Sequence, residues 1–238
     1  MRAIAGFGWH QIQSSTAFEI LIRGLRRLQW QDGSLCPELK LNTIDLHGWV
    51  LYPAALSPRS VAYTIGVGDD ICFELAMIRQ FEAEVHAFDA TPEVATWIAS
   101  KELPDSYNFH GWAAAGRDGN VNLRRWPGEC HPASHCGSPL SSKHEVQAIP
   151  AYSLKTLMKK LRHAHVDLLK INIDNAGSTV LDELVRTDIR PGQLLLGFRH
   201  CESSLKDEVI AATVQRLRKI GYRIFSVSKS GQEISLLF

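Results

Sequence analysis

Two glycines and a later aspartate stand at a spacing that suits a nucleoside-containing ligand. Gly66 and Gly68 follow the apolar run 61–65, and Asp89 follows the apolar run 84–88. Glycine lets the backbone approach a ligand closely, and the start of a following helix offers free N–H groups. A carboxylate about twenty residues further on, at the end of the next strand, can accept hydrogen bonds from ribose hydroxyls. The pattern predicts a nucleoside cofactor, and the alternative is a tight turn without a ligand.

Two acidic residues narrow the choice of cofactor. Asp69 and Asp70 stand where a dinucleotide turn would receive a pyrophosphate, and Ile71 replaces the third glycine of that motif. Carboxylates repel phosphate but attract the positively charged amine and sulfonium of S-adenosylmethionine. The sequence therefore predicts S-adenosylmethionine and disfavours a nicotinamide cofactor. The alternative role of the two aspartates is a favourable interaction with the helix dipole.

The elements that position these residues alternate between strand and helix. Short apolar runs indicate strands at 61–65, 84–88, 107–113, 166–173 and 193–198, and helical periodicity occurs at 71–81, 91–100, 153–161, 178–185 and 205–220. The last two runs, 222–227 and 233–238, are joined by a connection too short for a parallel pair, so they predict an antiparallel hairpin. Between 31 and 59 we expect a connecting region with one edge strand. The order predicts an α/β fold: a Rossmann-like, doubly wound, mostly parallel seven-stranded sheet with a C-terminal antiparallel hairpin.

Four sequence blocks carry a resemblance to a known family. The blocks Tyr63–Asp70, His86–Pro92, Asp167–Asp174 and Gly221–Ser228 resemble the FkbM-like family of S-adenosylmethionine-dependent methyltransferases, in the family's order, from about Trp49 to the C-terminus. The resemblance implies the class I methyltransferase fold and methylation of a hydroxyl on a small molecule, sugar or natural-product intermediate. It places the methionine part of the cofactor at the glycine turn, the ribose at Asp89 and the adenine near Trp112. The predicted cofactor-binding residues are Ile65, Gly66, Gly68, Asp69, Asp70, Asp89, Ala90, Thr91, Trp112, Ala113 and Asn172.

The chain departs from the family pattern where catalysis is expected. After the fourth strand, Asn172 stands where the family has Asp, and Asp174 stands where it has Glu. After the fifth strand the family has Glu-x-His, whereas this chain has Gly197 and Arg199 at those two positions, followed by His200. An asparagine cannot act as a general base at neutral pH. We therefore predict that Asp174 or His200 takes the proton of the acceptor hydroxyl. The alternative is a catalytically altered or inactive family member that serves as a cofactor-binding or interaction protein.

A loop from about 127 to 150 is rich in Ser, Pro and Gly. It is interpreted as a substrate lid that brings His135 to the acceptor as a third candidate catalytic residue, or as a plain mobile loop. The loop also holds Cys130, His131 and Cys136, but their spacing does not match the paired arms of a zinc site. No metal is predicted. Lys170, in the run 166–173, is either a core lysine or an active-site group.

The composition excludes several classes of partner. The chain has 238 residues, with 26 Lys and Arg against 25 Asp and Glu, so its formal net charge of +1 offers no field for nucleic acid or an anionic membrane. Its apolar runs are shorter than the roughly 18 residues of a membrane span. The beginning of the chain has no secretory signal pattern, and the five scattered cysteines are typical of reduced thiols. We expect a cytoplasmic protein that acts on a small-molecule acceptor.

The length suggests one large domain with an extension. We predict an N-terminal helical extension at 1–48 and the methyltransferase domain at 49–238. Residues 16–30 have the periodicity of an amphipathic helix, with Arg23, Arg26 and Arg27 beside its apolar positions. This helix is either packed on the main core or acts as a lid, a basic membrane-surface patch or the contact of a homo-oligomer.

Overall fold

The computed structural model describes residues 35–124, 146–172, 175–198 and 206–238. The chain divides into two compact units, Met1–Cys36 and Pro37–Phe238. The account below concerns the second unit. The amphipathic helix expected at 16–30 lies outside the described residues, so its role and the homo-oligomer through it stay predictions.

Seven strands form the central sheet. They lie in the order β11-β12-β10-β9-β3-β4-β5. All neighbours are parallel except β12, which runs antiparallel to both β10 and β11. The predicted α/β fold is confirmed, because this order with one antiparallel strand is the layout of class I methyltransferases. The strands are β3 (Val61–Ile65), β4 (Glu84–Phe88), β5 (Tyr107–His110), β9 (Leu168–Asn172), β10 (Gln193–Gly197), β11 (Arg223–Val227) and β12 (Glu233–Leu237).

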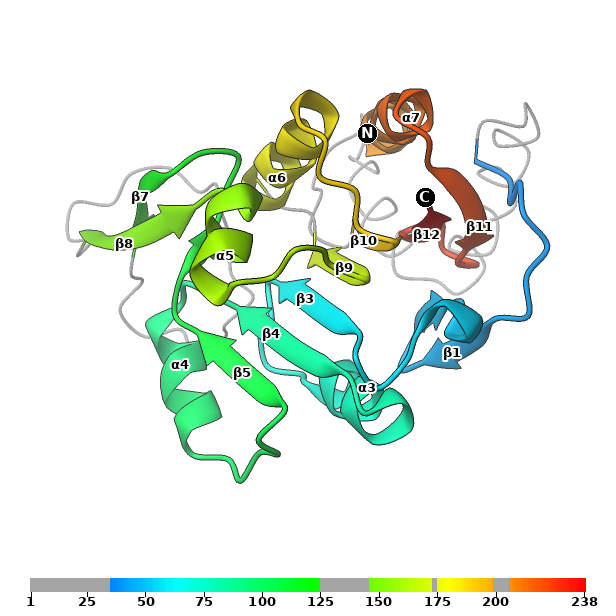
Figure 1. The fold of residues 1–238 in the computed structure, drawn as a ribbon. Coiled ribbons are helices and arrows are strands. Elements are labelled where there is room, and N and C mark those ends of the chain that lie inside the picture. The colour runs from blue at the N-terminus through cyan, green and yellow to red at the C-terminus, as the bar shows by residue number, and fades with distance from the viewer. Residues whose placement is uncertain (1–34, 125–145, 173–174, 199–205) are drawn as a thin grey trace, which may run out of the picture. The chain divides into compact units, whose positions relative to one another are not determined.

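Helices cover both faces of this sheet, as parallel strands require (Figure 1). One face carries the helices α3 (Cys72–Phe81) and α4 (Pro92–Ala99). The same face carries a small hairpin of β1 (Ile44–Leu46) and β2 (Trp49–Leu51). The hairpin is followed by the 3-10 turn η2 (Pro53–Ala55). The other face carries α5 (Leu154–Leu161), α6 (Asn175–Arg186) and α7 (Lys206–Lys219). None of the described helices is long and apolar enough to cross a membrane.

Local signals start the helices where the sequence predicts. Thr91 is the N-cap of α4 and Pro92 occupies its first turn, where a missing N–H costs nothing. Ser153 is the N-cap of α5, and its Oγ accepts a hydrogen bond from the Thr156 N–H at 3.2 Å. Thr and Ser are residue types that N-caps favour, and proline is common at the first helical position.

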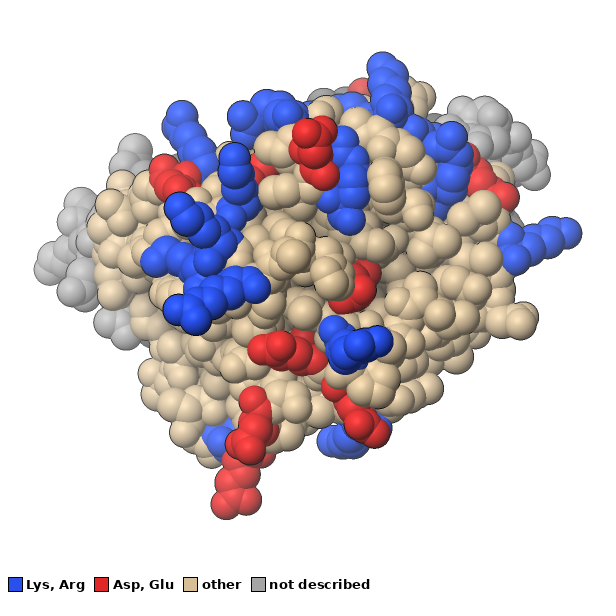
Figure 2. Space-filling view, viewed as in Figure 1, with Lys and Arg blue, Asp and Glu red and all other residues tan. Residues whose placement is uncertain are grey.

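Helix α5 shows how these helices meet the sheet. Its Leu154 and Leu157 are fully buried, whereas Lys155, Lys159 and Lys160 are exposed. Lysines and arginines gather over this part of the face drawn in Figure 2, with acidic groups elsewhere on the same face. The sharp separation of leucine from lysine makes α5 a surface helix that packs through one stripe.

A second sheet corrects two predictions. It consists of β6 (Ala113–Ala114), β8 (Val146–Tyr152) and β7 (Gly119–Arg124), in that order. The strand predicted at 107–113 therefore ends at His110, because Ala113 leaves the central sheet and pairs with Ala151. The loop predicted up to residue 150 is also wrong at its end. Residues 146–150 belong to β8, where antiparallel pairing with β7 satisfies their backbone groups.

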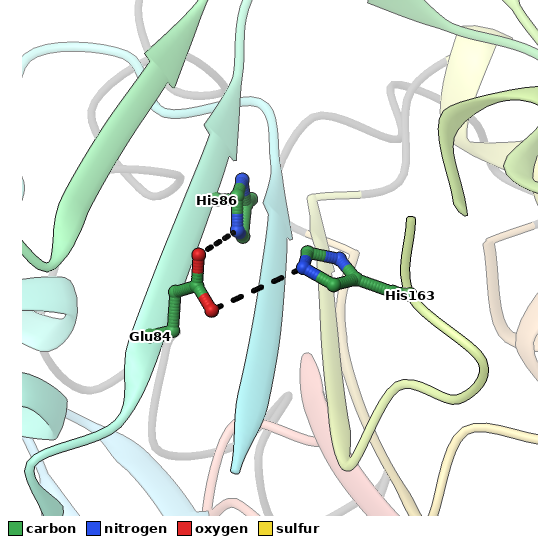
Figure 3. Close-up of side chains that lie close together, drawn as sticks. All are labelled: Glu84, His86 and His163. Carbon is green, nitrogen blue, oxygen red and sulfur yellow. Dashed lines mark hydrogen bonds and ion pairs between the residues drawn. The ribbon is translucent and has the colours of Figure 1, made fainter. Parts of the chain in front are cut away.

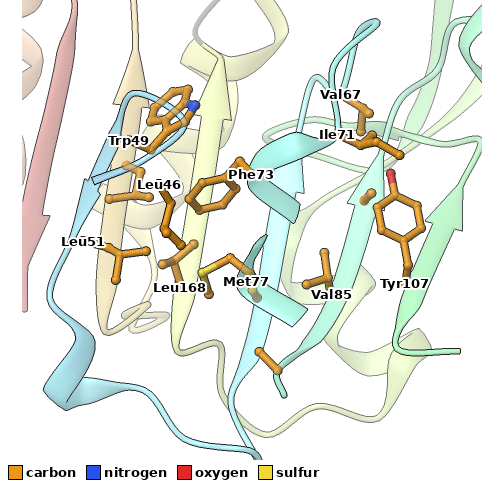
Figure 4. Packing of buried hydrophobic residues seen from close by; sticks show 14 of the residues in the cluster. Leu46, Trp49, Leu51, Val67, Ile71, Phe73, Met77, Val85, Tyr107 and Leu168 are labelled. Atoms are coloured by element: carbon orange, nitrogen blue, oxygen red, sulfur yellow. The ribbon is translucent and has the colours of Figure 1, made fainter. Parts of the chain in front are cut away.

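The core under α3 joins the hairpin to the sheet (Figure 4). Trp49 and Leu51 of the hairpin meet Phe73 and Met77 of α3 above Leu168 of β9. Trp49 and Phe73 contact edge to face, with ring centroids 6.2 Å apart. The prediction of one edge strand between 31 and 59 is therefore wrong: two strands there pair with each other and pack on the face of the sheet through their apolar side chains.

An ion pair lies inside this core. The Lys170 Nζ donates to Glu74 Oε1 at 2.8 Å, and the two side chains are 5% and 0% exposed. The ammonium also lies 5.1 Å and 5.2 Å from the ring centroids of Trp49 and Phe73. Lys170 is therefore the core lysine of the two alternatives, but it is paired with a carboxylate instead of reaching solvent.

We expect Glu74→Leu to lower the free energy of unfolding by about 3–5 kcal/mol, because it leaves the Lys170 ammonium buried without its partner. The double variant Glu74→Leu with Lys170→Met should recover most of that loss, since both charges are then removed. Denaturant titration measures both effects. As a control, Asp182→Asn breaks the Arg216–Asp182 pair, whose side chains are 46% and 49% exposed, and should cost less than about 1 kcal/mol. Equal losses in the single and double variants would contradict the assignment.

Candidate functional site

The candidate site lies where the direction of strand addition reverses. From β3 the chain moves to β4 on one side, whereas β9, the other neighbour of β3, leads to β10 on the opposite side. The helices that follow β3 and β9, α3 and α6, cover opposite faces of the sheet. Open α/β sheets bind their ligands at such a point, beyond the carboxyl ends of the strands. The side chain of Asn172, the last residue of β9, crosses this point and donates from Nδ2 to the Gly66 carbonyl at 2.7 Å.

The glycine turn after β3 has the conformation that its residues predict. Gly66 and Gly68 have φ of +79° and +65°, in the left-handed region that glycine favours. The Gly66 N–H donates to the Phe88 carbonyl at 3.0 Å. A Cβ on Gly66 would lie 3.3 Å from the Asn172 Cβ, whereas a Cβ on Gly68 would have no atom of the described residues within 4 Å. Among the described residues, the turn is thus closely packed at Gly66 and has free space at Gly68.

Asp89 joins the glycine turn to the next loop. Its Oδ2 accepts a hydrogen bond from the Gly68 N–H at 3.1 Å, and its Oδ1 accepts one from the Thr91 N–H at 2.9 Å. Each carboxylate oxygen has a second lone pair. Asp89 is half-buried, as are Ala90 and Thr91. The carboxylate can therefore hold the two loops together and still accept hydrogen bonds from two hydroxyls.

The two aspartates after the turn differ in their contacts. Both are exposed. Asp70 Oδ1 accepts a hydrogen bond from the Cys72 N–H at 2.8 Å, and this bond lowers the pKa of the Asp70 carboxyl. Asp70 thus satisfies a free N–H group at the start of α3, which is the alternative role that the sequence left open. Asp69 supplies a negative charge directly beside Gly68.

Trp112 lies next to the end of β5. The His110 carbonyl accepts hydrogen bonds from the Asp89 N–H at 3.2 Å and from the Trp112 N–H at 2.8 Å. The predicted site residues Asp89 and Trp112 therefore bind the same carbonyl oxygen. The Trp112 ring stacks on the His110 imidazole, 4.8 Å between centroids. It also meets Tyr152 edge-on at 5.4 Å. Burial lowers the pKa of His110 to about 4, so its ring is neutral at pH 7. Ala113, the next residue, is buried in β6.

Gly197 explains one departure from the family pattern. A Cβ at this position would lie 2.7 Å from Trp49 Cη2 and 2.9 Å from Asn172 Oδ1. No side chain fits there unless the buried Trp49 moves. A glutamate at 197 is therefore incompatible with the present packing, and this part of the site is filled by the hairpin.

The structure brings most predicted residues to one edge of the sheet. The cofactor-binding candidates there are Ile65, Gly66, Gly68, Asp69, Asp70, Asp89, Ala90, Thr91 and Asn172, with Trp112 and Ala113 beyond His110. The three candidate catalytic residues, Asp174, His200 and His135, lie outside the described residues, and their roles stay predictions. Sequence reasoning missed Trp49 and His110. Their positions depend on contacts between distant segments, although His110 ends a predicted strand.

Solved structures that are similar to this chain share little of its sequence. Neither a scan of protein-family models nor a search of curated proteins returns a match. Similar solved structures include a methyltransferase from Pyrococcus furiosus at 15% identity, with 92% of this chain and 97% of that chain covered and a TM-score of 0.40. Human N-acetylserotonin methyltransferase in complex with SAM follows at 12% identity, 78% and 48% coverage and a TM-score of 0.36.

A third similar structure comes from Haloferax volcanii. It is a chain of a complex that contains the Trm112 methyltransferase activator, at 10% identity, 72% and 65% coverage and a TM-score of 0.39. The chain thus spans less than two thirds of the human and Haloferax proteins. The identities and TM-scores are low, and the fold class rests on the strand order given above.

We expect Asn172→Asp to lower the free energy of unfolding by about 1–3 kcal/mol at pH 7, because a carboxylate oxygen would face the Gly66 carbonyl in place of a donor. Thermal and denaturant unfolding measure the loss. The matched control is Asn120→Asp on the exposed part of β7, which makes the same chemical change at the surface and should be nearly neutral. If the two variants are equally stable, the Asn172 hydrogen bond does not hold the turn.

Proposed function

We propose that this protein is an S-adenosylmethionine-dependent methyltransferase of the FkbM-like type, which methylates a hydroxyl of a small molecule, sugar or natural-product intermediate. One observation carries the proposal. The Asp89 carboxylate accepts a hydrogen bond from the Gly68 N–H of the glycine turn, at the point where the strand order reverses, and no described residue fills the space beside Gly68. Nucleoside ligands bind at this point in open α/β sheets.

The residues present fit this cofactor better than a dinucleotide. Asp89 retains lone pairs for the ribose hydroxyls, and Trp112 offers an aromatic ring close by for the adenine. Asp69 is an exposed carboxylate beside Gly68, where it favours the positive methionine part and disfavours a pyrophosphate. Asp70 already caps α3, so Asp69 is the stronger candidate of the two.

The reaction needs a base from this chain. When bound, S-adenosylmethionine supplies a methyl group on a positively charged sulfur. The acceptor oxygen forms a bond to that methyl carbon while sulfur retains the electron pair of the broken bond, and the hydroxyl proton must leave. The Asn172 amide cannot take this proton, and its Nδ2 already donates to Gly66. Asp174 and His200, which follow β9 and β10, are the proposed bases, with His135 as a third candidate.

A second function is favoured by the same departures. Asn172 is not a base, and the packing around Gly197 leaves no room for an acidic side chain. These features also suit a protein that binds the cofactor without transferring its methyl group. Cofactor binding and methyl transfer are therefore tested separately.

We expect S-adenosylhomocysteine to bind saturably in calorimetry, and Asp89→Asn to weaken binding about 10–100-fold, because hydrogen bonds to a charged acceptor are replaced by weaker ones. The amide keeps the size of the side chain but turns its NH2 group toward the N–H of Gly68 or Thr91, so thermal unfolding is measured beside binding to show that the variant is folded. Asp105→Asn, at an exposed position before β5, is the control and should bind like the wild type. The proposal fails if the wild-type protein binds no S-adenosylhomocysteine.

Methyl transfer is measured with isotopically labelled S-adenosylmethionine and a panel of hydroxyl-bearing acceptors. We expect labelled ether product, and a decrease of about 10²–10⁴-fold in the rate when Asp174→Asn or His200→Gln removes the base, with cofactor binding unchanged. Binding of S-adenosylhomocysteine without transfer to any acceptor in the panel would favour the second function.

A further inference from the structure

A second cluster of polar side chains lies on the opposite face of the sheet from the Lys170–Glu74 pair. Glu84 and His86 are two residues apart on β4, so they point to the same face, and His163 follows α5. Glu84 is the first residue of β4, whereas Asp89 follows its last one. At about 3.3 Å per residue, Glu84 lies roughly 16 Å and His86 roughly 10 Å along the strand from Asp89.

From this cluster we infer a site for a divalent transition metal, with zinc as the expected ion, bound by Glu84, His86 and His163. One ligand atom from each residue can be chosen so that all lie within 4.8 Å of one another. Figure 3 shows the Glu84 carboxylate between the two imidazoles. His86 Nε2 lies 3.0 Å from Glu84 Oε1, and His163 Nε2 lies 3.9 Å from Glu84 Oε2.

The donor set selects the type of ion. Zinc accepts imidazole nitrogen and carboxylate oxygen at about 2.0–2.2 Å, so neighbouring ligands in a tetrahedral site lie about 3.3 Å apart. The three ligand atoms lie within 4.8 Å of one another in the structure, so an ion requires side-chain rotation to bring them to that spacing. Two imidazoles among three ligands disfavour calcium and magnesium, which prefer oxygen ligands. Three protein ligands leave a fourth position for water.

The second nitrogen of each imidazole already has a partner. His86 Nδ1 is 2.9 Å from His110 Nε2, and His163 Nδ1 is 2.8 Å from the hydroxyl of the fully buried Tyr63. Metal-binding histidines almost always have such an outer contact, which fixes the ring orientation. With Nδ1 held by these contacts, the Nε2 atoms of both rings are the atoms that face Glu84.

The backbone holds the ligands in place while leaving access from solvent. Glu84 and His86 are paired with β3 on one side. The His163 N–H donates to the Met158 carbonyl at 2.9 Å, after Arg162 at a φ of +61°. The Glu84 side chain is 50% exposed, whereas those of His86 and His163 are 5% and 13% exposed. An ion can thus enter beside Glu84 and would link β4 to the segment after α5.

Zinc binding to the full chain is measured by calorimetry and by metal analysis after dialysis. We expect one zinc ion per protein chain. Glu84→Gln and His163→Ala should each lower the zinc affinity by at least about 100-fold, because losing a residue that only contacts a ligand already lowers metal affinity by about 10–100-fold. Tyr63→Phe removes the outer partner of His163 and should cost about 10-fold. Glu82→Gln and His165→Ala, which are exposed neighbours outside the cluster, should bind like the wild type.

Two further measurements separate this site from the cysteines of the chain and from misfolding. Co²⁺ in place of zinc should give the visible bands of a tetrahedral site without thiolate charge-transfer absorption. Glu84→Gln keeps the size of a half-exposed side chain, so without metal the variant should unfold at the same temperature as the wild type. Zinc should raise the melting temperature of the wild type but not that of the variant. The site is overturned if the wild type binds no zinc, or if zinc binding survives both Glu84→Gln and His163→Ala.

Discussion

The reversal of strand order between β3 and β9 is the constraint on which the candidate site depends. Parallel strands need helical crossovers, and the crossovers from these two neighbours leave toward opposite faces. The backbone therefore separates at one point of the carboxyl edge. Asn172 spans that point by its bond to the Gly66 carbonyl. This bond ties the glycine turn to the end of β9, and a Cβ on Gly68 would meet no atom of the described residues within 4 Å.

The carboxyl edge is held together by side chains that bind backbone groups. Asp89 joins two loops through the N–H groups of Gly68 and Thr91, and Asp70 binds the first N–H of α3. Such bonds satisfy groups that the ends of strands and helices leave without partners. The same carboxylates carry the negative charge that the proposed cofactor requires. Structural and binding roles thus coincide, which is why the test at Asp89 uses an isosteric amide.

The two faces of the sheet are built differently. Under α3, a buried lysine and glutamate neutralise one another inside an apolar core. On the face of α5, Tyr63, His86, His110 and His163 form a chain of ring contacts and hydrogen bonds across β3, β4 and β5. His110 belongs to both regions, because its ring stacks on Trp112 and its nitrogen meets His86. The inferred metal site and the proposed cofactor site are therefore neighbours through one residue.

The sequence by itself determined the order and type of the strands of the central sheet and of the helices that cover it, because apolar periodicity, caps and glycines act over a few residues. It also predicted the glycine turn and Asp89, since parallel strands bring their carboxyl ends to one edge. Only the tertiary structure decided the partner of Lys170, the obstruction of Gly197 by Trp49 and the meeting of Glu84 with His163. The end of β5 at His110 and the pairing of 146–150 in β8 were likewise decided by a second sheet. Each of these depends on contacts between segments far apart in the chain, and no local pattern specifies which distant side chain fills a given space.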